Sequence, residues 1–306
     1  MAFSAQDVKD LREKTGVGMM DCKKALAATD GDIEQAVAWL REKGLAAAEK
    51  KAGRIAAEGM AYAAVIDGVG VVVEVNSESD FVAKNDKFVE YVQNVAAVVA
   101  KENPADLDAL MACPYPDGGT VEQAQQEKVL VIGENIKVRR FARYATGLSV
   151  PYVHMGGRIG VVVNMEVSAG LEQKPEVVEL GKDIAMQIAA LNPTYKDKSD
   201  VSEEFIEKEK EIRLAQAKED PKNAKKPDAI IEKIVMGGIG KYFKEICLLQ
   251  QPFVKDDKVS VEEHIAAVAK QVGASIKLVG YTRFEKGEGI EKRQDDLAEE
   301  VAKLIK

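Results

Sequence analysis

The chain has 306 residues, of which 46% are hydrophobic and 31% are charged, and its formal net charge is −8. This composition is typical of a globular protein with two or three domains and shows no sign of disorder. The acidic balance argues against a broad nucleic-acid surface, because such surfaces bind phosphates mainly through clustered cations. The basic stretch 137–140 is a local exception, which we expect to form a solvated face of a sheet.

The cysteines and the N-terminus indicate the compartment. Cys22, Cys113 and Cys247 lie far apart, so they indicate neither a disulfide framework nor a CxxC metal site. The first residues lack the basic and apolar regions of a signal peptide. No apolar run approaches the roughly 20 residues that cross a bilayer. These features predict a cytoplasmic protein without a membrane partner.

Residues 1–54 are predicted to form a three-helix domain followed by a linker. Ser4 is a capping residue for the first helix, and Gly16-Val17-Gly18 interrupts the helical pattern. A second helix begins near Met19, and the third is predicted to end at Gly44. Apolar residues at helical spacing give each helix one buried face.

Beyond this domain the hydrophobic period changes from that of a helix to that of a strand. Tyr62–Ile66 and Gly70–Val75 flank the turn signal Asp67-Gly68, which predicts a β-hairpin. A helix is predicted from about Asp86 to Lys101.

The chain also contains an internal repeat. Gly70–Val73 recurs as Gly160–Val163, and 132–138 is echoed by 272–278 at a longer offset. The change of offset means that the second copy carries about fifty residues that the first copy lacks.

The predicted fold class is therefore α+β, with two related lobes that contain antiparallel strands. The lobes are assigned to 55–147 and 148–287, and the second carries an antiparallel helical hairpin at about 196–245. This hairpin is either a stabilising flap or a contact arm. Residues 288–306 are predicted to form a C-terminal helix.

No motif for bond-making chemistry is evident. His154 and His264 lack neighbouring metal ligands, and Gly237–Lys241 lacks the first glycine and the Ser or Thr of a P-loop. There is no GxSxG motif. We therefore expect no metal, no cofactor and no enzymatic activity.

The loop Ser79-Asp80-Phe81-Val82 follows the predicted central strand and has polar residues on both sides. Phe81 either folds back into the core, as most phenylalanines do, or is an aromatic anchor beside a carboxylate. The residues alone favour the core. However, the repeat copy, Val167–Glu172, has no aromatic residue at this place.

Met19 and Met20 raise a similar question. An adjacent methionine pair after a glycine-rich turn cannot point entirely inward, so at least one is available to a partner.

Taken together, the segments resemble the bacterial elongation factor Ts family, the guanine-nucleotide exchange factors of elongation factor Tu. The resemblance runs in order over essentially the whole chain. It is carried by Leu11–Leu26, Glu74–Lys84, Gly133–Ile136, His154 with Arg158–Val161, Gln251–Val254 and Arg283–Lys292.

The resemblance implies a partner, a mechanism and residue roles. The partner is elongation factor Tu, GDP-bound or nucleotide-free, from which Mg²⁺ is displaced so that GDP is released and exchanged for GTP. The first three helices are similar to a ubiquitin-associated domain, in which Leu11, Met19 and Met20 pack on the partner's GTPase domain. Residues 79–82 push in near the nucleotide's magnesium, and His154 is a further contact.

The resemblance also bears on the helical hairpin, the C-terminal helix and two shorter stretches. The helical hairpin and the C-terminal helix are similar to the family's coiled-coil and C-terminal modules, and dimerisation through the hairpin is a further hypothesis. Ser77 occupies a position where the family has a cysteine, so no thiol chemistry is implied. The turn-rich stretch 111–119 looks like an insertion and has no family role.

Two other classes of function are compatible with parts of the chain. A ubiquitin-associated-type adaptor would account for the first domain but not for the duplicated lobes. An RNA-binding protein would use Lys137, Arg139, Arg140 and Arg143, and its binding would be strongly salt-sensitive. No direct nucleic-acid partner is expected for an exchange factor.

Overall fold

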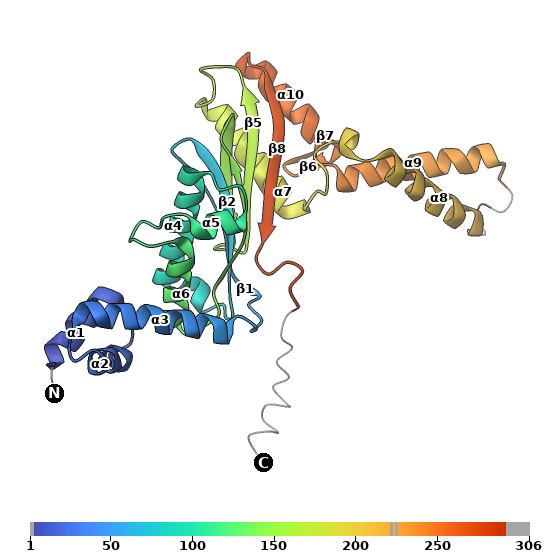
Figure 1. Ribbon diagram of the computed structural model, residues 1–306. Coiled ribbons are helices and arrows are strands. Elements are labelled where there is room, and N and C mark those ends of the chain that lie inside the picture. Colours follow the sequence, from blue (N-terminus) through green and yellow to red (C-terminus); the bar gives the residue numbers. More distant parts are fainter. Residues whose placement is uncertain (1–2, 221–222, 224–225, 292–306) are drawn as a thin grey trace. The chain divides into compact units, whose positions relative to one another are not determined.

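The computed structural model describes residues 3–220, 223 and 226–291 of a mixed α+β protein (Figure 1). Contacts divide the chain into two compact units. The first unit consists of the described parts of Met1–Arg143, Val153–Gly160 and Phe284–Lys306, and the second of Tyr144–Tyr152 and Val161–Arg283.

Three helices form the N-terminal part of the first unit, as the sequence predicts: α1 (Ala5–Thr15), α2 (Met19–Ala28) and α3 (Ile33–Lys51). The Ser4 hydroxyl accepts a hydrogen bond from the Asp7 amide, and Gly16 ends α1 with a φ of 67°. Their common core contains Leu11, Cys22 and Leu26, which are completely buried.

The predicted end of α3 at Gly44 is wrong, because the helix continues to Lys51. Gly44 is buried, and a Cβ at this position would lie 3.3 Å from the carbonyl oxygen of Gln126. The glycine therefore allows α3 to pack closely against another helix and does not terminate it.

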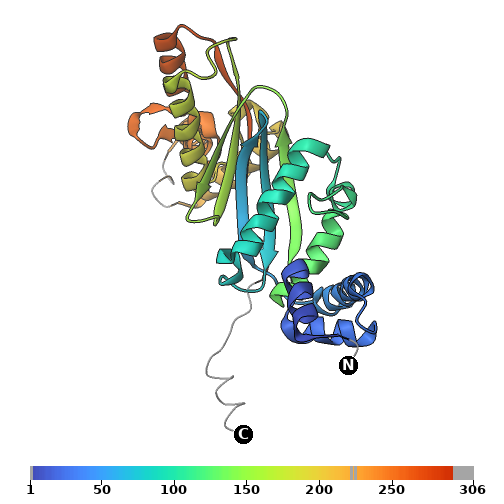
Figure 2. The same cartoon turned by 90° about the vertical axis from the view of Figure 1, so that its left-hand side faces the viewer.

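The first sheet has three strands in the order β1-β2-β3: β1 (Glu58–Ile66), β2 (Val69–Ser77) and β3 (Lys137–Tyr144). The β1–β2 hairpin is antiparallel with Ile66 opposite Val69, and it turns at Asp67 and Gly68, both with positive φ. Helix α4 (Asp86–Glu102) lies across this sheet and buries Phe88 and Tyr91 against it (Figure 2). The predicted hairpin and helix are confirmed.

The second sheet repeats this strand order as β4-β5-β8: β4 (Leu148–His154), β5 (Ile159–Val167) and β8 (Ile276–Glu285). Four helices correspond in pairs between the lobes: α4 with α7 (Pro175–Leu191), and α6 (Val121–Ile132) with α10 (Val261–Val272). Asn103 and Asn192 end α4 and α7 in the left-handed conformation, and Gly133 and Gly273 do the same for α6 and α10. The repeat read from the sequence is therefore a repeat of backbone geometry.

The stretch 111–119 is not an insertion, because the second lobe has a counterpart to it. After the short helix α5 (Leu107–Ala112), Pro114 bridges to Thr120, which caps α6. In the second lobe Pro252 pairs with Ser260, which caps α10, through strands β6 (Pro252–Phe253) and β7 (Asp256–Ser260). The shared Pro-aromatic and Ser/Thr-Val-Glu sequences were the signal for this correspondence.

Two helices occupy the additional segment of the second copy: α8 (Glu203–Glu219) and α9 (Asp228–Ile246). The rings of Phe205 and Tyr242 stack with centroids 6.3 Å apart. Because Phe205 begins α8 and Tyr242 lies near the end of α9, the two helices run antiparallel (Figure 1).

The C-terminal helix predicted for 288–306 lies outside the described residues from 292 onward. Among the helices that the structure describes, none combines the length and the apolar character needed to cross a membrane.

Candidate protein-binding site

The loop at the end of β2 presents an aromatic side chain to solvent. Phe81 is 81% exposed, the highest value among the large hydrophobic residues that the structure describes. The alternative in which Phe81 folds into the core is therefore wrong. An exposed aromatic ring held on a scaffold is typical of a contact surface.

The residues that follow Phe81 are buried, in contrast to Phe81 itself. Val82 and Ala83 are buried in the short helix η1 (Val82–Lys84), and Val82 belongs to the core beneath the first sheet. Asn85 then caps α4, its side-chain oxygen accepting from the Lys87 amide at 3.0 Å. Phe81 is thus the one apolar residue of the loop left outside.

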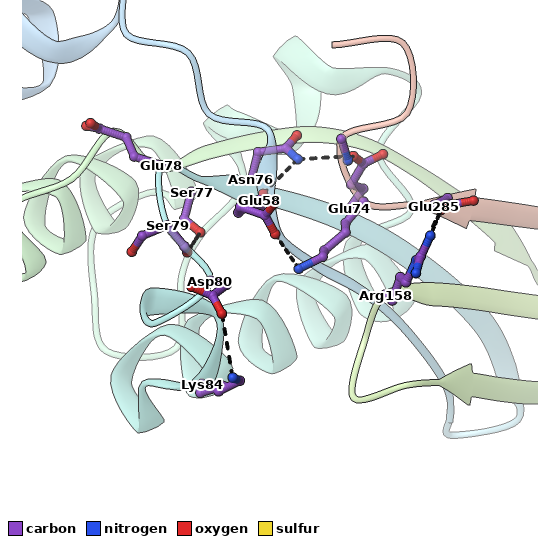
Figure 3. A network of polar contacts seen from close by, with 12 residues as sticks. Glu58, Glu74, Asn76, Ser77, Glu78, Ser79, Asp80, Lys84, Arg158 and Glu285 are labelled. Carbon is purple, nitrogen blue, oxygen red and sulfur yellow. Dashed lines mark hydrogen bonds and ion pairs between the residues drawn. The ribbon is translucent and has the colours of Figure 1, made fainter. Parts of the chain in front are cut away.

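Asp80 lies on the surface beside Phe81. Its carboxylate is 3.6 Å from the ammonium of Lys84, and both side chains are more than half exposed (Figure 3). Ion pairs of this kind contribute little to stability, so the carboxylate can exchange its partner at little cost.

Ser79 faces the protein and binds Glu134. The Ser79 hydroxyl donates to Glu134 Oε1 at 2.6 Å, and the Ser79 and Glu78 amides donate to Glu134 Oε2 at 2.9 and 3.1 Å. In addition, the Ser77 hydroxyl donates to the Ser79 carbonyl at 3.0 Å (Figure 3).

The Glu78 side chain makes a second set of contacts that hold the same loop. The Asn135 amide donates to Glu78 Oε1 at 2.6 Å, and Arg54 lies 3.4 Å from the same oxygen. The Asn135 side chain donates in turn to the Arg54 carbonyl at 2.8 Å.

The structure brings the turn before the methionine pair close to this loop. Gly16–Gly18 and Phe81 line one hollow of about 610 Å³ in the first unit, and the Lys87 ammonium donates to the Gly16 carbonyl at 3.3 Å. Met19 and Met20, which begin α2, are 45% and 64% exposed. Both methionines are therefore available to a partner.

Two predicted contact residues occupy different surroundings. Leu11 is completely buried in the N-terminal core. His154 is half-buried at the end of strand β4 and does not line the hollow. Their direct contact with a partner stays a prediction, and the burial of Leu11 favours a supporting role for that residue.

The expected solvated face at 137–140 is wrong, because its arginines bind a buried carboxylate. Glu74 is fully buried on β2, with Arg139 Nη1 3.0 Å from one carboxylate oxygen and Arg140 Nε bonded to the other. The guanidinium of Arg143 donates to the Ala100 carbonyl at 2.9 Å. These partners leave little basic surface for RNA. A lone Glu in an otherwise apolar strand was the signal for the site.

Residues after β8 dock on this same buried group. The Gly287 amide donates to Glu74 Oε1 at 2.8 Å, and a Cβ at Gly287 would lie 2.0 Å from the Ala57 carbonyl oxygen. Next to it Arg158 pairs with Glu285 at 3.2 Å (Figure 3). The segment is thereby fixed along the sheet whose central strand leads into the loop.

The described residues contain no group of three or more His, Cys, Asp or Glu side chains that could hold a metal ion. Burial raises the pKa of the Cys22 thiol and raises that of Cys247 to about 11, which opposes formation of a thiolate nucleophile.

An exposed aromatic tip on a rigid support, with exposed methionines nearby, defines a protein that acts by binding another protein. The sequence profile of the family described as Elongation factor TS matches residues 78–288. The protein named Elongation factor Ts from Syntrophotalea carbinolica is 48% identical to the chain over 100% of both sequences. The protein of that name from Clostridium perfringens strain SM101 is also 48% identical, over 99% of both sequences. The protein of that name from Magnetococcus marinus is 45% identical over 100% of the chain and 99% of its own length.

The chain belongs to the elongation factor Ts family, the nucleotide exchange factors for elongation factor Tu. The resemblance seen in the sequence is thus confirmed. Members of this family are exchange factors of translation and not enzymes.

Proposed function

We propose that residues 79–82 promote GDP release from elongation factor Tu by displacing the support of its nucleotide-bound Mg²⁺. The observation that carries this proposal is the exposure of Phe81 on a loop whose backbone is held from two sides. Such a side chain can enter a partner with little loss of its own conformational freedom.

The physical basis is the coordination of magnesium. Mg²⁺ requires near-ideal octahedral geometry and has few protein ligands at nucleotide sites, so a small displacement of its support weakens it. Burial of the Phe81 ring in an apolar pocket is favourable by about 1.5–3 kcal/mol. Asp80 supplies an acceptor for donors that the displacement exposes. Because linkage is reciprocal, the factor loosens GDP as much as GDP loosens the factor.

The remaining predicted residues divide by exposure. Met19 and Met20 dock on the GTPase domain, and His154 is a separate contact. Leu11 and Val82 are buried, so they act by holding the exposed residues next to them. The role of Ser79 is likewise a supporting one, since its hydroxyl is bonded to Glu134.

Release of a fluorescent GDP analogue from elongation factor Tu tests the tip. Phe81→Ala is expected to slow the stimulated release at least about tenfold while circular dichroism stays unchanged. Val65→Ala, at the opposite end of the β1–β2 hairpin and 40% exposed, is the matched control. Wild-type release by Phe81→Ala would refute the mechanism while leaving the family membership intact.

The finer architecture belongs to the same proposal: a ubiquitin-associated-like domain at 1–54, lobes at 55–147 and 148–287, and a C-terminal module at 288–306, in a cytoplasmic protein. The hairpin α8–α9 is proposed as a contact arm through which the chain dimerises. Support for this comes from its exposed apolar side chains Ile212, Ile230, Ile234 and Met236. Light scattering of the full chain tests it: a monomer at all concentrations would contradict dimerisation.

A further inference from the structure

We infer that Glu134 is a positioning residue for exchange: its carboxylate holds the backbone before Phe81 and so sets the direction in which the ring leaves the protein. This inference rests on the proposed function of the tip. It assigns a role to a residue 55 positions away from Ser79 in the sequence.

The bonding pattern at Glu134 is that of a clamp. Both carboxylate oxygens are used, and all three donors belong to Glu78 and Ser79. These two residues lie immediately beyond the last residue of β2, Ser77, where the strand ladder no longer holds the backbone. Hydrogen bonds to an ionised acceptor are shorter and about twice as strong as those between neutral groups.

Glu134 itself is held from both sides along the chain. Gly133 ends α6 with a φ of 87°, and Asn135 is buried with its amide bonded to the Glu78 carboxylate. The two segments therefore hold each other reciprocally: Glu134 accepts from the Glu78 amide, and Glu78 accepts from the Asn135 amide. Because both segments of this clamp are anchored, it can fix the position and direction of the nearby Phe81 side chain as closely as entry into a partner requires.

The second lobe provides an internal comparison. The residue at the place of Glu134 is Ala274, and the following Ser275 bonds Ser168 through its carbonyl and its amide. That lobe thus closes its loop without a carboxylate, and the loop carries no aromatic residue. The carboxylate clamp occurs where the exposed ring occurs, which the shared fold alone does not require.

The clamp also predicts that the hydroxyl group is the part of the Ser79 side chain needed to hold the loop. The Ser79 hydroxyl donates to Glu134, so a threonine, which keeps this hydroxyl, can replace it, whereas an alanine cannot.

The first experiment measures stimulated GDP release over a range of full-length exchange factor concentrations. Glu134→Ala is expected to lower the maximal rate about tenfold while the half-saturating concentration changes less than about twofold, because docking surfaces remain. Glu134→Gln keeps an acceptor for the amides and should recover most of the rate. The matched control is Glu127→Ala on the preceding helix α6, where the carboxylate lies 4.0 Å from the ammonium of its neighbour Lys128. A rate for Glu134→Ala equal to that of Glu127→Ala would overturn the inference.

The second experiment separates positioning from direct action. If Glu134 acts through Phe81, the loss in the double variant Phe81→Ala/Glu134→Ala equals the loss in Phe81→Ala alone. Full additivity of the two losses would overturn the inference.

Amide hydrogen exchange of Glu78 and Ser79 tests the clamp without reference to activity. Both amides are expected to exchange at least about tenfold faster in Glu134→Ala than in Glu127→Ala. Unchanged protection would overturn the clamp. If Phe81→Ala leaves GDP release unchanged, the proposed function of the tip fails, and the amide exchange alone then decides whether Glu134 holds this loop.

Discussion

The loop after the central strand differs in character between the two lobes. In the first lobe it exposes Phe81 and is bonded to Glu134. In the second lobe it carries a half-buried Leu171 and is closed by Ser168 and Ser275. Strand order is the same in both sheets. The fold therefore tolerates either loop, so the shared fold does not by itself account for the exposed ring.

The centre of each sheet shows a second difference. Glu74 on β2 corresponds to Asn164 on β5, and both are buried. Glu74 pairs with two arginines, whereas the Asn164 amide donates to the Thr146 carbonyl at 2.7 Å. The sheet that leads into the tip thus has a buried charge at its centre, whereas the other sheet has a neutral amide there.

Replacing Glu74 by Ala should have the largest effect on stability. Removing one side of a buried ion pair costs about 3–5 kcal/mol, whereas Asn164→Ala, which removes neutral hydrogen bonds, should cost about 1–3 kcal/mol. Urea unfolding followed by circular dichroism measures both. Equal losses would show that the buried charge makes no difference between the lobes.

Replacing Ser79 by Ala should slow stimulated GDP release about three- to tenfold, since one hydrogen bond to a charged acceptor is lost. Ser79→Thr should stay within about twofold of the wild type. Ser168→Ala, which removes the hydroxyl that bonds the loop of the second lobe to Ser275, should leave release unchanged. A slower release in Ser168→Ala would mean that the two loops do not differ in function.

Met20→Ala should separate docking from the action of the tip. We expect a half-saturating concentration about fivefold higher at an unchanged maximal rate, because Met20, once covered by the partner, contributes equally to binding before and after Mg²⁺ is displaced. The readout is the same release assay. A lowered maximal rate would mean that Met20, like Phe81, takes part in displacing Mg²⁺ and not only in docking.

The smallest expected effect is a pH dependence confined to the second lobe. Burial lowers the pKa of His264, whose ring stacks on Phe253 at 4.0 Å, while the first lobe has Ala124 at this place. The unfolded chain therefore binds a proton at His264 more tightly than the folded chain does. The free energy of unfolding is not reduced by His264 above the ordinary histidine pKa, and it falls as the pH drops below that value. Unfolding at pH 5 and pH 7 should show this loss in the wild type, and His264→Gln should reduce it.

Much of the fold was predictable because its signals are local. The Ser4 cap, the Asp67-Gly68 turn and the spacing of apolar residues depend on neighbours within a few positions. The repeat also followed from the sequence alone, since both copies preserve their apolar strands and their helix-ending residues. The tip residues were predicted as a segment, although the residues alone favoured a buried Phe81.

Only the tertiary structure decided how these segments are used. Phe81 is exposed although its neighbours Val82 and Ala83 are buried, and Gly44 lies inside α3 at a point where α6 approaches closely. The partners of Glu74 and Ser79 lie more than 50 residues away in the chain. Hydrophobic periodicity and turn chemistry act over short sequence distances, so the sequence determined the elements, whereas long-range packing determined which side chains remain outside.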